Sequence, residues 1–209
     1  MQRVRNELAK GPKTSLPPVA EVWPAQNPTP TAMAERFAQE LTTVHGEVIR
    51  CGSMQEAAQK LAELVRQAGW TSLGAMERTA VHEATASLPA NTLRWAAPEW
   101  QPREVATFSA SVITAEALLA DTGSCIVACP TASDRLLCYL PPACVVIARL
   151  DQLAETLPAA WPGVMARVAD RTRRGELVIL TGPSRTSDIE KILTLGVHGP
   201  KRLVVVLVG

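Results

Sequence analysis

The chain has 209 residues, 47% of them hydrophobic and 20% charged, with a formal net charge of +1. This composition can bury a full core, which excludes a chain that is disordered throughout, and the near-neutral charge excludes the basic excess that non-specific binding to nucleic acid requires. The longest unbroken apolar run, LVVVLV, is too short to span a bilayer, and no apolar segment follows the charged N-terminus. We therefore expect a cytoplasmic protein with no membrane span.

The first 30 residues are rich in proline and are expected to form an extended arm, followed by one domain over residues 31–209. Six of the sixteen prolines lie in this arm, and proline both removes a backbone donor and disfavours helix at the residue before it. Thr31 is expected to cap a helix with apolar residues at helical spacing. The strand GEVIRC follows, and Ser53 with Glu56 forms a capping-box pattern for a second helix that ends at Gly69.

The rest of the chain alternates between expected strands and expected helices. The strands are 71–75, 92–96, 106–114, 124–129, 144–148, 176–181 and 202–208. The helices are 79–87, 115–123, 150–157 and 161–174. Alternating elements, with strands that are apolar on both faces, predict an α/β fold of three layers in which helices cover both sides of a mainly parallel sheet.

The loop after the strand ELVILT is the first candidate for a binding site, because ligands of open parallel sheets bind beyond the carboxyl ends of the strands. Ser187, followed by Asp188 and Glu190, has the pattern of a helix N-terminus. This helix is expected to end at Gly196. Capping alone explains these polar residues, but it does not explain Arg185.

Arg185 lies in a loop that also contains the hydroxyls of Ser184 and Thr186, after Gly182 and Pro183. A guanidinium, two hydroxyls and the N–H groups of a helix N-terminus can together hold a carboxylate or phosphate. The alternative is that Arg185 is a solvated surface residue.

His198 lies in the sequence GVHGP, next to Gly199, where the backbone must turn sharply. An imidazole in such a place can act as an acid or base near neutral pH. It can equally be an exposed loop histidine without a chemical role.

Two further groups are candidates if the fold brings them near this loop. Thr122, Gly123 and Ser124 belong to the turn DTGS, in which Gly123 is expected to be the left-handed cap of a helix. Glu116 is expected in the first turn of that helix and is a second candidate base, although a surface charge there would also complement the helix dipole.

Several common sites are missing from the sequence. Neither the G-x-x-x-x-G-K-[ST] phosphate loop nor the G-x-G-x-x-G and G-x-S-x-G motifs occur. The cysteines form no C-x-x-C pair, and we expect them to be reduced thiols that fill the core. We expect no metal and no resident cofactor in this chain.

Four segments, in this order and separation, resemble the LUD domain of the lactate-utilisation proteins. They are ITAEALLADTGS from Ile113, RLLCYLPP from Arg135, TGPSRTSDIE from Thr181 and GVHGP from Gly196. Because the chain is short and has no iron–sulfur cysteine clusters, it is similar to the C group of that family rather than the B group. The family often has a histidine after the double proline, whereas Cys144 lies near that place here.

The resemblance implies a three-layer fold related to the NagB, RpiA and CoA-transferase group. It also implies a place in the system that oxidises L-lactate to pyruvate, with the iron–sulfur clusters on partner subunits. The candidate binding positions that it carries over are Thr122 to Ser124, Gly182 to Asp188, and His198 with Gly199.

Three functions follow from these observations. The first is an accessory subunit of L-lactate oxidation that binds a small anionic ligand. The second is a stand-alone transferase-like or isomerase-like enzyme with His198 or Glu116 as base and Arg185 as anion clamp. The third is a non-catalytic interaction module that docks through its proline-rich arm. The chain is also a candidate homo-oligomer.

Overall fold

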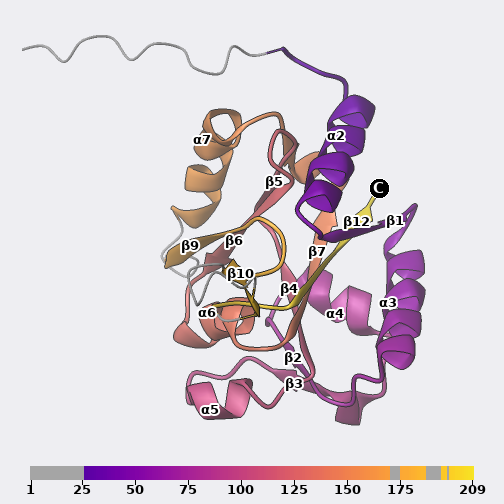
Figure 1. The fold of residues 1–209 in the computed structure, drawn as a ribbon, viewed down its shortest axis with the longest axis vertical. Helices are drawn as coiled ribbons and strands as arrows, with labels where there is room; N and C mark the ends of the chain where they lie inside the picture. The colour runs from indigo at the N-terminus through magenta and orange to yellow at the C-terminus, as the bar shows by residue number, and fades with distance from the viewer. Residues whose placement is uncertain (1–25, 170–174, 187–193, 197) are drawn as a thin grey trace, which may run out of the picture.

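A six-stranded parallel sheet forms the centre of the protein (Figure 1). The computed structural model describes residues 26–169, 175–186, 194–196 and 198–209. The strand order in this sheet is β1-β12-β7-β4-β2-β3, and every neighbouring pair is parallel. The bounds are β1 Glu47–Cys51, β2 Leu73–Ala75, β3 Leu93–Trp95, β4 Ala110–Thr114, β7 Ala143–Arg149 and β12 Arg202–Val208.

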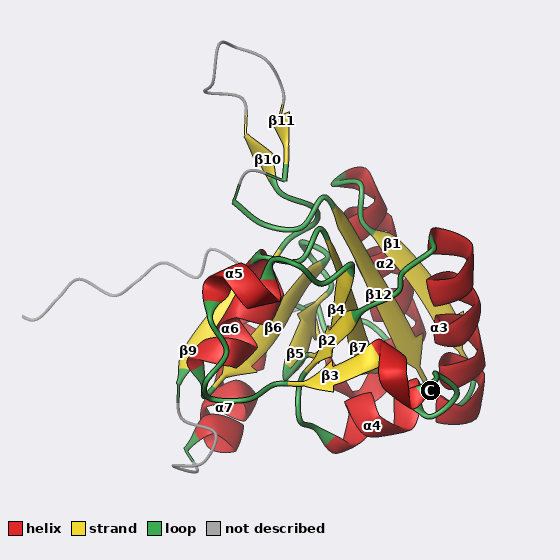
Figure 2. Cartoon of the chain, turned by 90° about the horizontal axis from the view of Figure 1, so that it is seen from below, coloured by secondary structure: helices red, strands yellow, loops and turns green. Residues whose placement is uncertain are grey.

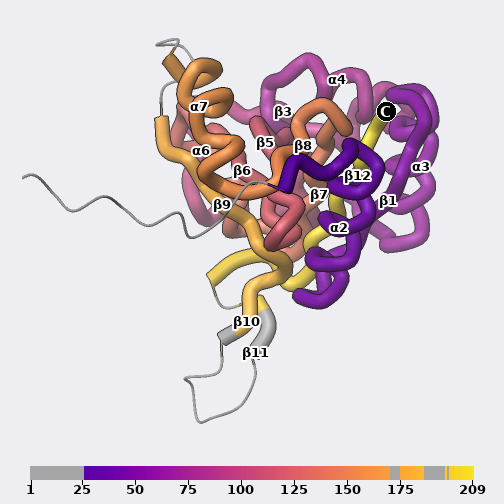
Figure 3. Tube along the Cα trace, turned by 90° about the horizontal axis from the view of Figure 1, so that it is seen from above, coloured from indigo at the N-terminus to yellow at the C-terminus, as the bar shows by residue number. Residues whose placement is uncertain are grey.

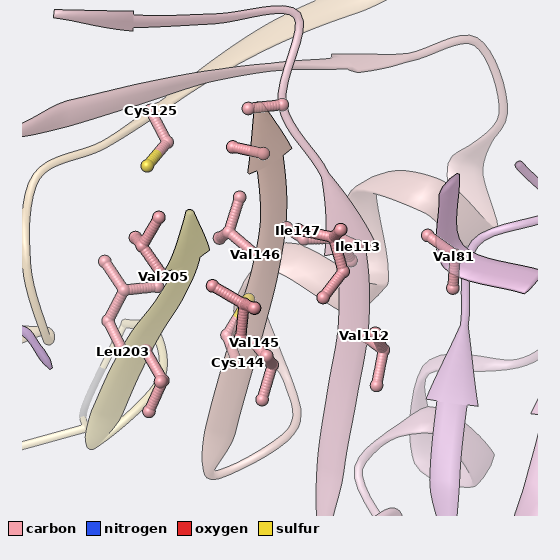
Figure 4. Packing of buried hydrophobic residues seen from close by; sticks show 14 of the residues in the cluster. Val81, Val112, Ile113, Cys125, Cys144, Val145, Val146, Ile147, Leu203 and Val205 are labelled. Atoms are coloured by element: carbon pink, nitrogen blue, oxygen red, sulfur yellow. The ribbon is translucent and has the colours of Figure 1, made fainter. Parts of the chain in front are cut away.

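The two central strands, β7 and β12, are buried on both faces because their sequences are apolar at successive positions. Side chains alternate between the faces of a strand, so a strand without a polar side must be covered on both sides. Figure 4 shows Val145 and Val146 of β7 beside Leu203 and Val205 of β12, and Ile147 of β7 beside Ile113 of β4. These side chains belong to the main hydrophobic core.

Helices cover both sides of this sheet, as the sequence predicts. On one side, α3 (Met54–Ala68) packs against β1 and β12, and α4 (Thr79–Thr85) packs against β4 and β7. On the other side lie α2 (Pro30–Thr43), α5 (Pro102–Val105), α6 (Ala132–Tyr139) and a second sheet (Figure 1). The three-layer α/β prediction with a mainly parallel sheet is confirmed.

The second sheet has four strands in the order β8-β5-β6-β9. They are β8 Leu153–Ala154, β5 Ala117–Leu119, β6 Ser124–Cys129 and β9 Glu176–Leu180. β6 is antiparallel to both β5 and β9, while β5 and β8 are parallel. The helix α7 (Leu157–Val168) packs on this sheet, and α2 and α7 both contact β8 (Figure 3).

The prediction of a helix over residues 115–123 is wrong, because this segment contains β5. Ala117 and Leu119 pack against α7, while Leu118 between them points into the main core. Burial of alternate residues on opposite sides is the geometry of a strand and not of a helix. Glu116 therefore does not lie in the first turn of a helix.

Other expected boundaries are also corrected. Thr29 caps α2 in place of Thr31, because Pro30 occupies the first helical position and the Thr29 hydroxyl accepts from the Ala32 N–H. The expected helix over 150–157 is a short 3-10 turn (Leu150–Gln152) followed by β8. The expected helix over 161–174 is α7, which starts earlier and ends at Val168, while residues 170–174 lie outside the described ranges.

Several helix signals are confirmed. The Ser53 hydroxyl accepts from the Glu56 N–H at 3.2 Å, and α3 ends at Gly69 with a φ of 66°. None of the helices in the described part of the chain has the length and apolar character needed to cross a bilayer.

A charged pair joins β1 to β12 at the start of both strands. Arg202 donates from Nε and Nη2 to the two carboxylate oxygens of Glu47, at 2.6 and 2.8 Å, and its guanidinium lies 5.6 Å from the centre of the Trp70 ring. The hydrogen bond from Arg202 lowers the pKa of Glu47 from its ordinary value. The pair therefore stabilises the fold when Glu47 is ionised.

We expect the substitution E47Q to lower the free energy of unfolding at pH 7 by about 1 kcal/mol or less, because both side chains of the pair are well exposed. A lowered folded-state pKa stabilises the protein above the ordinary value of 4.5 and loses that effect as the pH falls through the folded value. Urea unfolding from pH 7 to pH 3 should therefore show a difference between wild type and E47Q that shrinks on acidification. The exposed substitution E99Q is the control, and a difference that grew at low pH would contradict this account.

Candidate functional site

The structure places the turn DTGS beside the loop TGPSRT, although the two are far apart in sequence. The Ser124 hydroxyl lies 2.8 Å from the Thr122 hydroxyl and 2.7 Å from the Thr181 hydroxyl. Gly123 has a φ of 63°, and a Cβ added there would overlap the backbone nitrogen of Leu41 in α2. This turn is therefore packed directly against the last turns of α2.

Ser184 joins this loop to the segment GVHGP. Its hydroxyl accepts from the His198 N–H at 3.2 Å, and its own N–H donates to the Pro200 carbonyl at 2.8 Å. A Cβ on Gly199 would lie 3.2 Å from the Ser184 Cβ. We call residues 121–124, 181–186 and 198–200 the loop cluster.

Within the loop cluster, Gly182 lies close to α2, since a Cβ there would be 2.7 Å from the Val44 carbonyl oxygen, and Pro183 is buried. Arg185 and His198 are exposed. Most of the candidate binding residues are thus neighbours in space. Ser187 and Asp188 lie outside the described residues, and their assignment stays a prediction.

The location of this cluster differs from the expected one. β9, which carries ELVIL, belongs to the second sheet, so the loop after it does not follow a strand of the parallel sheet. The Lys201 N–H donates to the Pro142 carbonyl, immediately before β7 and β12 begin. The loop cluster therefore lies at the amino edge of the parallel sheet, where its strands start.

The expected helix that ends at Gly196 is also wrong at its C-terminal end. Arg185–Thr186 form β10, which pairs antiparallel with β11 (Thr194–Leu195). Figure 2 shows these two strands projecting away from both sheets. Arg185 accordingly lies on a strand and not at a described helix N-terminus.

Glu116 lies at the opposite edge of the parallel sheet, just after β4. Its N–H donates to the Ile126 carbonyl at 2.7 Å, its carbonyl accepts from Arg167 Nη1 at 2.7 Å, and the residue is 8% exposed. β7 crosses the sheet with seven residues, so the two edges are roughly 20 Å apart at about 3.3 Å per residue. Glu116 and His198 cannot contact the same small ligand.

The carboxyl edge of the parallel sheet divides between β4 and β2. β4 and β2 are neighbours in this sheet. Along the chain, β2 is followed by β3, which lies on one side of the pair, and β4 is followed in the sheet by β7, which lies on the other side. The chain therefore leaves the two carboxyl ends in opposite directions, and this is where open α/β sheets form a crevice for ligands.

A cavity of about 390 Å³ lies at this point, which is the size of a small-molecule site. Its polar lining residues are Glu77, Arg78, Thr79, Thr114, Glu116 and Gln152. We call this cavity the switch-point crevice. It contains one of the two candidate bases from the sequence and none of the candidate anion-binding residues.

Arg78 is the cation of the crevice. Its Nη1 donates to the Glu77 carbonyl at 2.8 Å, and its Nη2 lies 3.7 Å from the carboxylate of Asp134, farther than a hydrogen bond. Asp134 is 3% exposed and accepts from the N–H and hydroxyl of Thr131 in the capping box of α6. The buried carboxylate therefore holds the guanidinium near the crevice without occupying its donors in a close pair.

The β4 side of the crevice consists of hydrogen-bonded polar groups. The Thr114 hydroxyl donates to the Ile147 carbonyl at 2.9 Å. The Gln152 amide donates to the Ala115 carbonyl at 2.6 Å and accepts from the Arg149 N–H at 2.6 Å. These bonds tie β4 to the end of β7, so this wall has a defined shape.

Sequence reasoning missed Arg78, Thr114 and Gln152. Ligands of open parallel sheets bind beyond the carboxyl ends of the strands. The sequence predicts such a site after ELVILT, but that strand lies in the second sheet, whereas β2 (LGA) and β4 (ASVIT) lie in the parallel sheet. Arg78 comes three residues after the end of β2, a position from which the same rule could have found it.

A larger cavity of about 630 Å³ lies between α3 and residues 87–92. Its walls include Val65, Trp70 and Leu88, and its charged residues Glu63 and Arg66 lie one turn apart on the surface of α3. This cavity is not at the carboxyl end of a strand. Among the described residues, no three His, Cys, Asp or Glu side chains form a group that could hold a metal ion.

A parallel sheet with helices on both sides and a crevice at its switch point defines an α/β protein of the open-sheet class. The model of the LUD domain family matches residues 34–208, and the chain belongs to that family. The resemblance in the sequence is thereby confirmed.

Three known proteins are similar to this chain. Lactate utilization protein C of Deinococcus radiodurans is 41% identical over 76 residues, which are 36% of this chain and 34% of that protein. Lactate utilization protein C of Bacillus pumilus is 28% identical over 99 residues, which are 47% of this chain and 41% of that protein. The matches thus span less than half the length of these two relatives.

The third is the crystal structure of a DUF162 family protein from Deinococcus radiodurans. It has a TM-score of 0.65 and 18% identity, and the match covers 87% of this chain and 99% of that one. At this identity the likeness concerns the fold.

We expect G123A to destabilise the protein more than G69A. Both glycines have a left-handed φ, but a Cβ at Gly69 meets nothing within 4 Å, whereas one at Gly123 meets the backbone of α2. G69A should cost about 1–2 kcal/mol from the backbone conformation alone, and G123A should cost about 1–3 kcal/mol more from overpacking. Urea denaturation of both variants measures the difference, and equal losses would show that the turn can move away from α2.

Proposed function

We propose that this protein is an accessory component of an L-lactate utilisation system, in which L-lactate is oxidised to pyruvate together with iron–sulfur partner proteins. The observation that carries the proposal is the LUD family match over residues 34–208, joined to the names of the two relatives, both lactate utilization protein C. The proposal includes the binding of a small anionic ligand by this chain.

An accessory role is consistent with the electron balance of the reaction. Oxidation of a hydroxy acid to an oxo acid releases two electrons and two protons, and these electrons need a redox group as acceptor. We assign that role to iron–sulfur clusters on the partner proteins. Iron–sulfur ligands are cysteine thiolates, commonly in C-x-x-C runs, and the five cysteines of the sequence form no C-x-x-C pair.

The anionic ligand has two candidate places in this chain. The loop cluster exposes Arg185 and His198 at the amino edge. The switch-point crevice offers Arg78 and Glu116 at the carboxyl edge. A stand-alone enzyme is the second candidate function, because Glu116 lies in the same cavity as a cation that can orient a substrate.

Deletion of the gene tests the pathway. We expect the deletion strain to grow poorly on L-lactate as sole carbon source and normally on pyruvate, because only the oxidation step is impaired. Expression of the full chain from a plasmid should restore growth. Normal growth on L-lactate, in a strain without a second copy of the gene, would contradict the proposal.

Purified proteins separate the accessory role from the stand-alone enzyme. The full chain alone should not reduce an artificial dye acceptor with L-lactate, and its addition to the iron–sulfur fraction of a deletion strain should increase lactate-dependent dye reduction several-fold. The control is the same fraction with added albumin. Dye reduction by the chain alone, or no increase on its addition, would overturn the accessory role.

A further inference from the structure

We propose that an exposed apolar face between α7 and β9 is the docking site of residues 1–25 of the same chain. In the part of the chain that the structure describes, four large hydrophobic residues are exposed, and three of them belong to these two elements. They are Trp161 and Met165 of α7 and Ile179 of β9, which are 44%, 45% and 47% exposed. We call these three side chains the α7–β9 face.

Ile179 lies on the side of the second sheet on which α7 packs. Its partner in β6 is Ile126, and paired residues of neighbouring strands point to the same side of a sheet. Ile126 packs with Ala160 and Val164 of α7. The helix itself contacts β5 and β8, whereas β9 lies at the other end of the sheet. α7 therefore covers one half of this side and leaves Ile179 exposed on the other half.

Trp161 and Met165 point from α7 toward β9. β8 and β9 are parallel, because β8 is parallel to β5 and β6 is antiparallel to both β5 and β9. α7 connects β8 to β9, and such crossovers are right-handed in nearly all proteins. Each of the two side chains follows a buried residue by one position, which is about 100° further round a helix. In a right-handed crossover this rotation turns a side chain toward the later strand, so all three apolar side chains border the same space.

The described chain begins beside the N-terminal end of α7. The N–H groups of Gln26 and Asn27 donate to the carboxylate oxygens of Glu155 at 3.0 to 3.3 Å. Glu155 is buried, and it directly precedes Thr156, the residue that caps α7. The 25 preceding residues are therefore joined to the domain at the start of the helix that carries two members of the α7–β9 face.

The length and composition of the preceding sequence fit this face. Residues 15–25, SLPPVAEVWPA, have a single charged side chain, and Val19 and Trp23 are among the apolar ones. A chain extends by at most about 3.3–3.6 Å per residue, so Val19 can lie up to roughly 23 Å from Gln26. Met165 is the ninth residue of α7, which is about 14 Å along the helix. Apolar side chains of this sequence can thus reach the α7–β9 face and remove it from water.

This contact goes beyond the proposed function and does not depend on it. It makes the proline-rich arm a part of the domain surface in the free protein. A partner that bound the arm would then have to compete with the α7–β9 face for the same apolar side chains.

Disulfide trapping in the full chain tests the contact. The five natural cysteines are all buried, so cysteines introduced on the surface are the accessible thiols. We expect V19C/M165C to form an intramolecular disulfide in oxidised glutathione, seen as a monomer without the two introduced thiols. The matched control is V19C/A166C, because Ala166 is exposed on the same helix but points away from β9. It should cross-link about 10-fold more slowly, since docking raises the effective concentration at position 165 alone.

Labelling of single cysteine variants is an independent measurement. The thiol of M165C should react with a maleimide several-fold more slowly than that of A166C, because residues 1–25 cover the first position and not the second. Adding the substitutions V19S, V22S and W23S should speed the labelling of M165C and leave that of A166C unchanged.

Three results would overturn the docking of residues 1–25. One is equal cross-linking of V19C with positions 165 and 166. Another is labelling of M165C that does not respond to the serine substitutions. The third is a disulfide-linked dimer of M165C formed without any cysteine at position 19, because this would show that a second copy of the chain occupies the face.

Discussion

β12 occupies the middle of the parallel sheet, although it is the last strand of the chain, and the rest of the fold depends on its insertion. All seven of its residues pair with β7, and five also pair with β1. Its apolar side chains face both layers, so helices and the second sheet must be in place on either side before it is fully buried. The main core is therefore complete only when the two ends of the described domain have met.

This insertion also explains why the two edges of the sheet differ. At the amino edge, the segment that leads into β12 lies beside the loop after β9. Ser184 of that loop bonds to the His198 N–H and to the Pro200 carbonyl of this segment. Gly123 and Gly182 allow these loops to contact α2 closely. At the carboxyl edge, β4 and β2 send the chain in opposite directions, and the cavity with Arg78 and Glu116 lies between them. Close packing characterises the first edge, and an accessible polar cavity characterises the second.

The physical character of the crevice follows from this topology. Asp134 comes from α6 on one side of the sheet, and Arg78 comes from the start of α4 on the other, yet both lie near the ends of β4 and β2. A buried carboxylate at 3.7 Å positions the guanidinium without a close ion pair. The family match places the chain among the LUD domain proteins, and the crevice is one of the two places proposed for its anionic ligand.

Much of the fold could be predicted from local patterns. The strands EVIRC and RLVVVLV, the Ser53 cap and the Gly69 helix end depend on residues that are close in sequence, and they are where the patterns place them. The segment around Leu118 could not be predicted in this way. Its short apolar run fits either a helix or a strand, and only the positions of α7 and the main core, on opposite sides of it, decide for a strand.

The candidate site divides in the same manner. From the sequence by itself, the resemblance to the LUD domain groups Thr122 to Ser124, Gly182 to Asp188, and His198 with Gly199 as candidate binding positions, and the structure brings the described members together. The sequence could not determine at which edge they lie, because that depends on whether ELVIL joins the parallel sheet or the second one. Strand partners are chosen by contacts between residues far apart in the chain. Tertiary structure alone therefore separated Glu116 from His198 and placed it with Arg78.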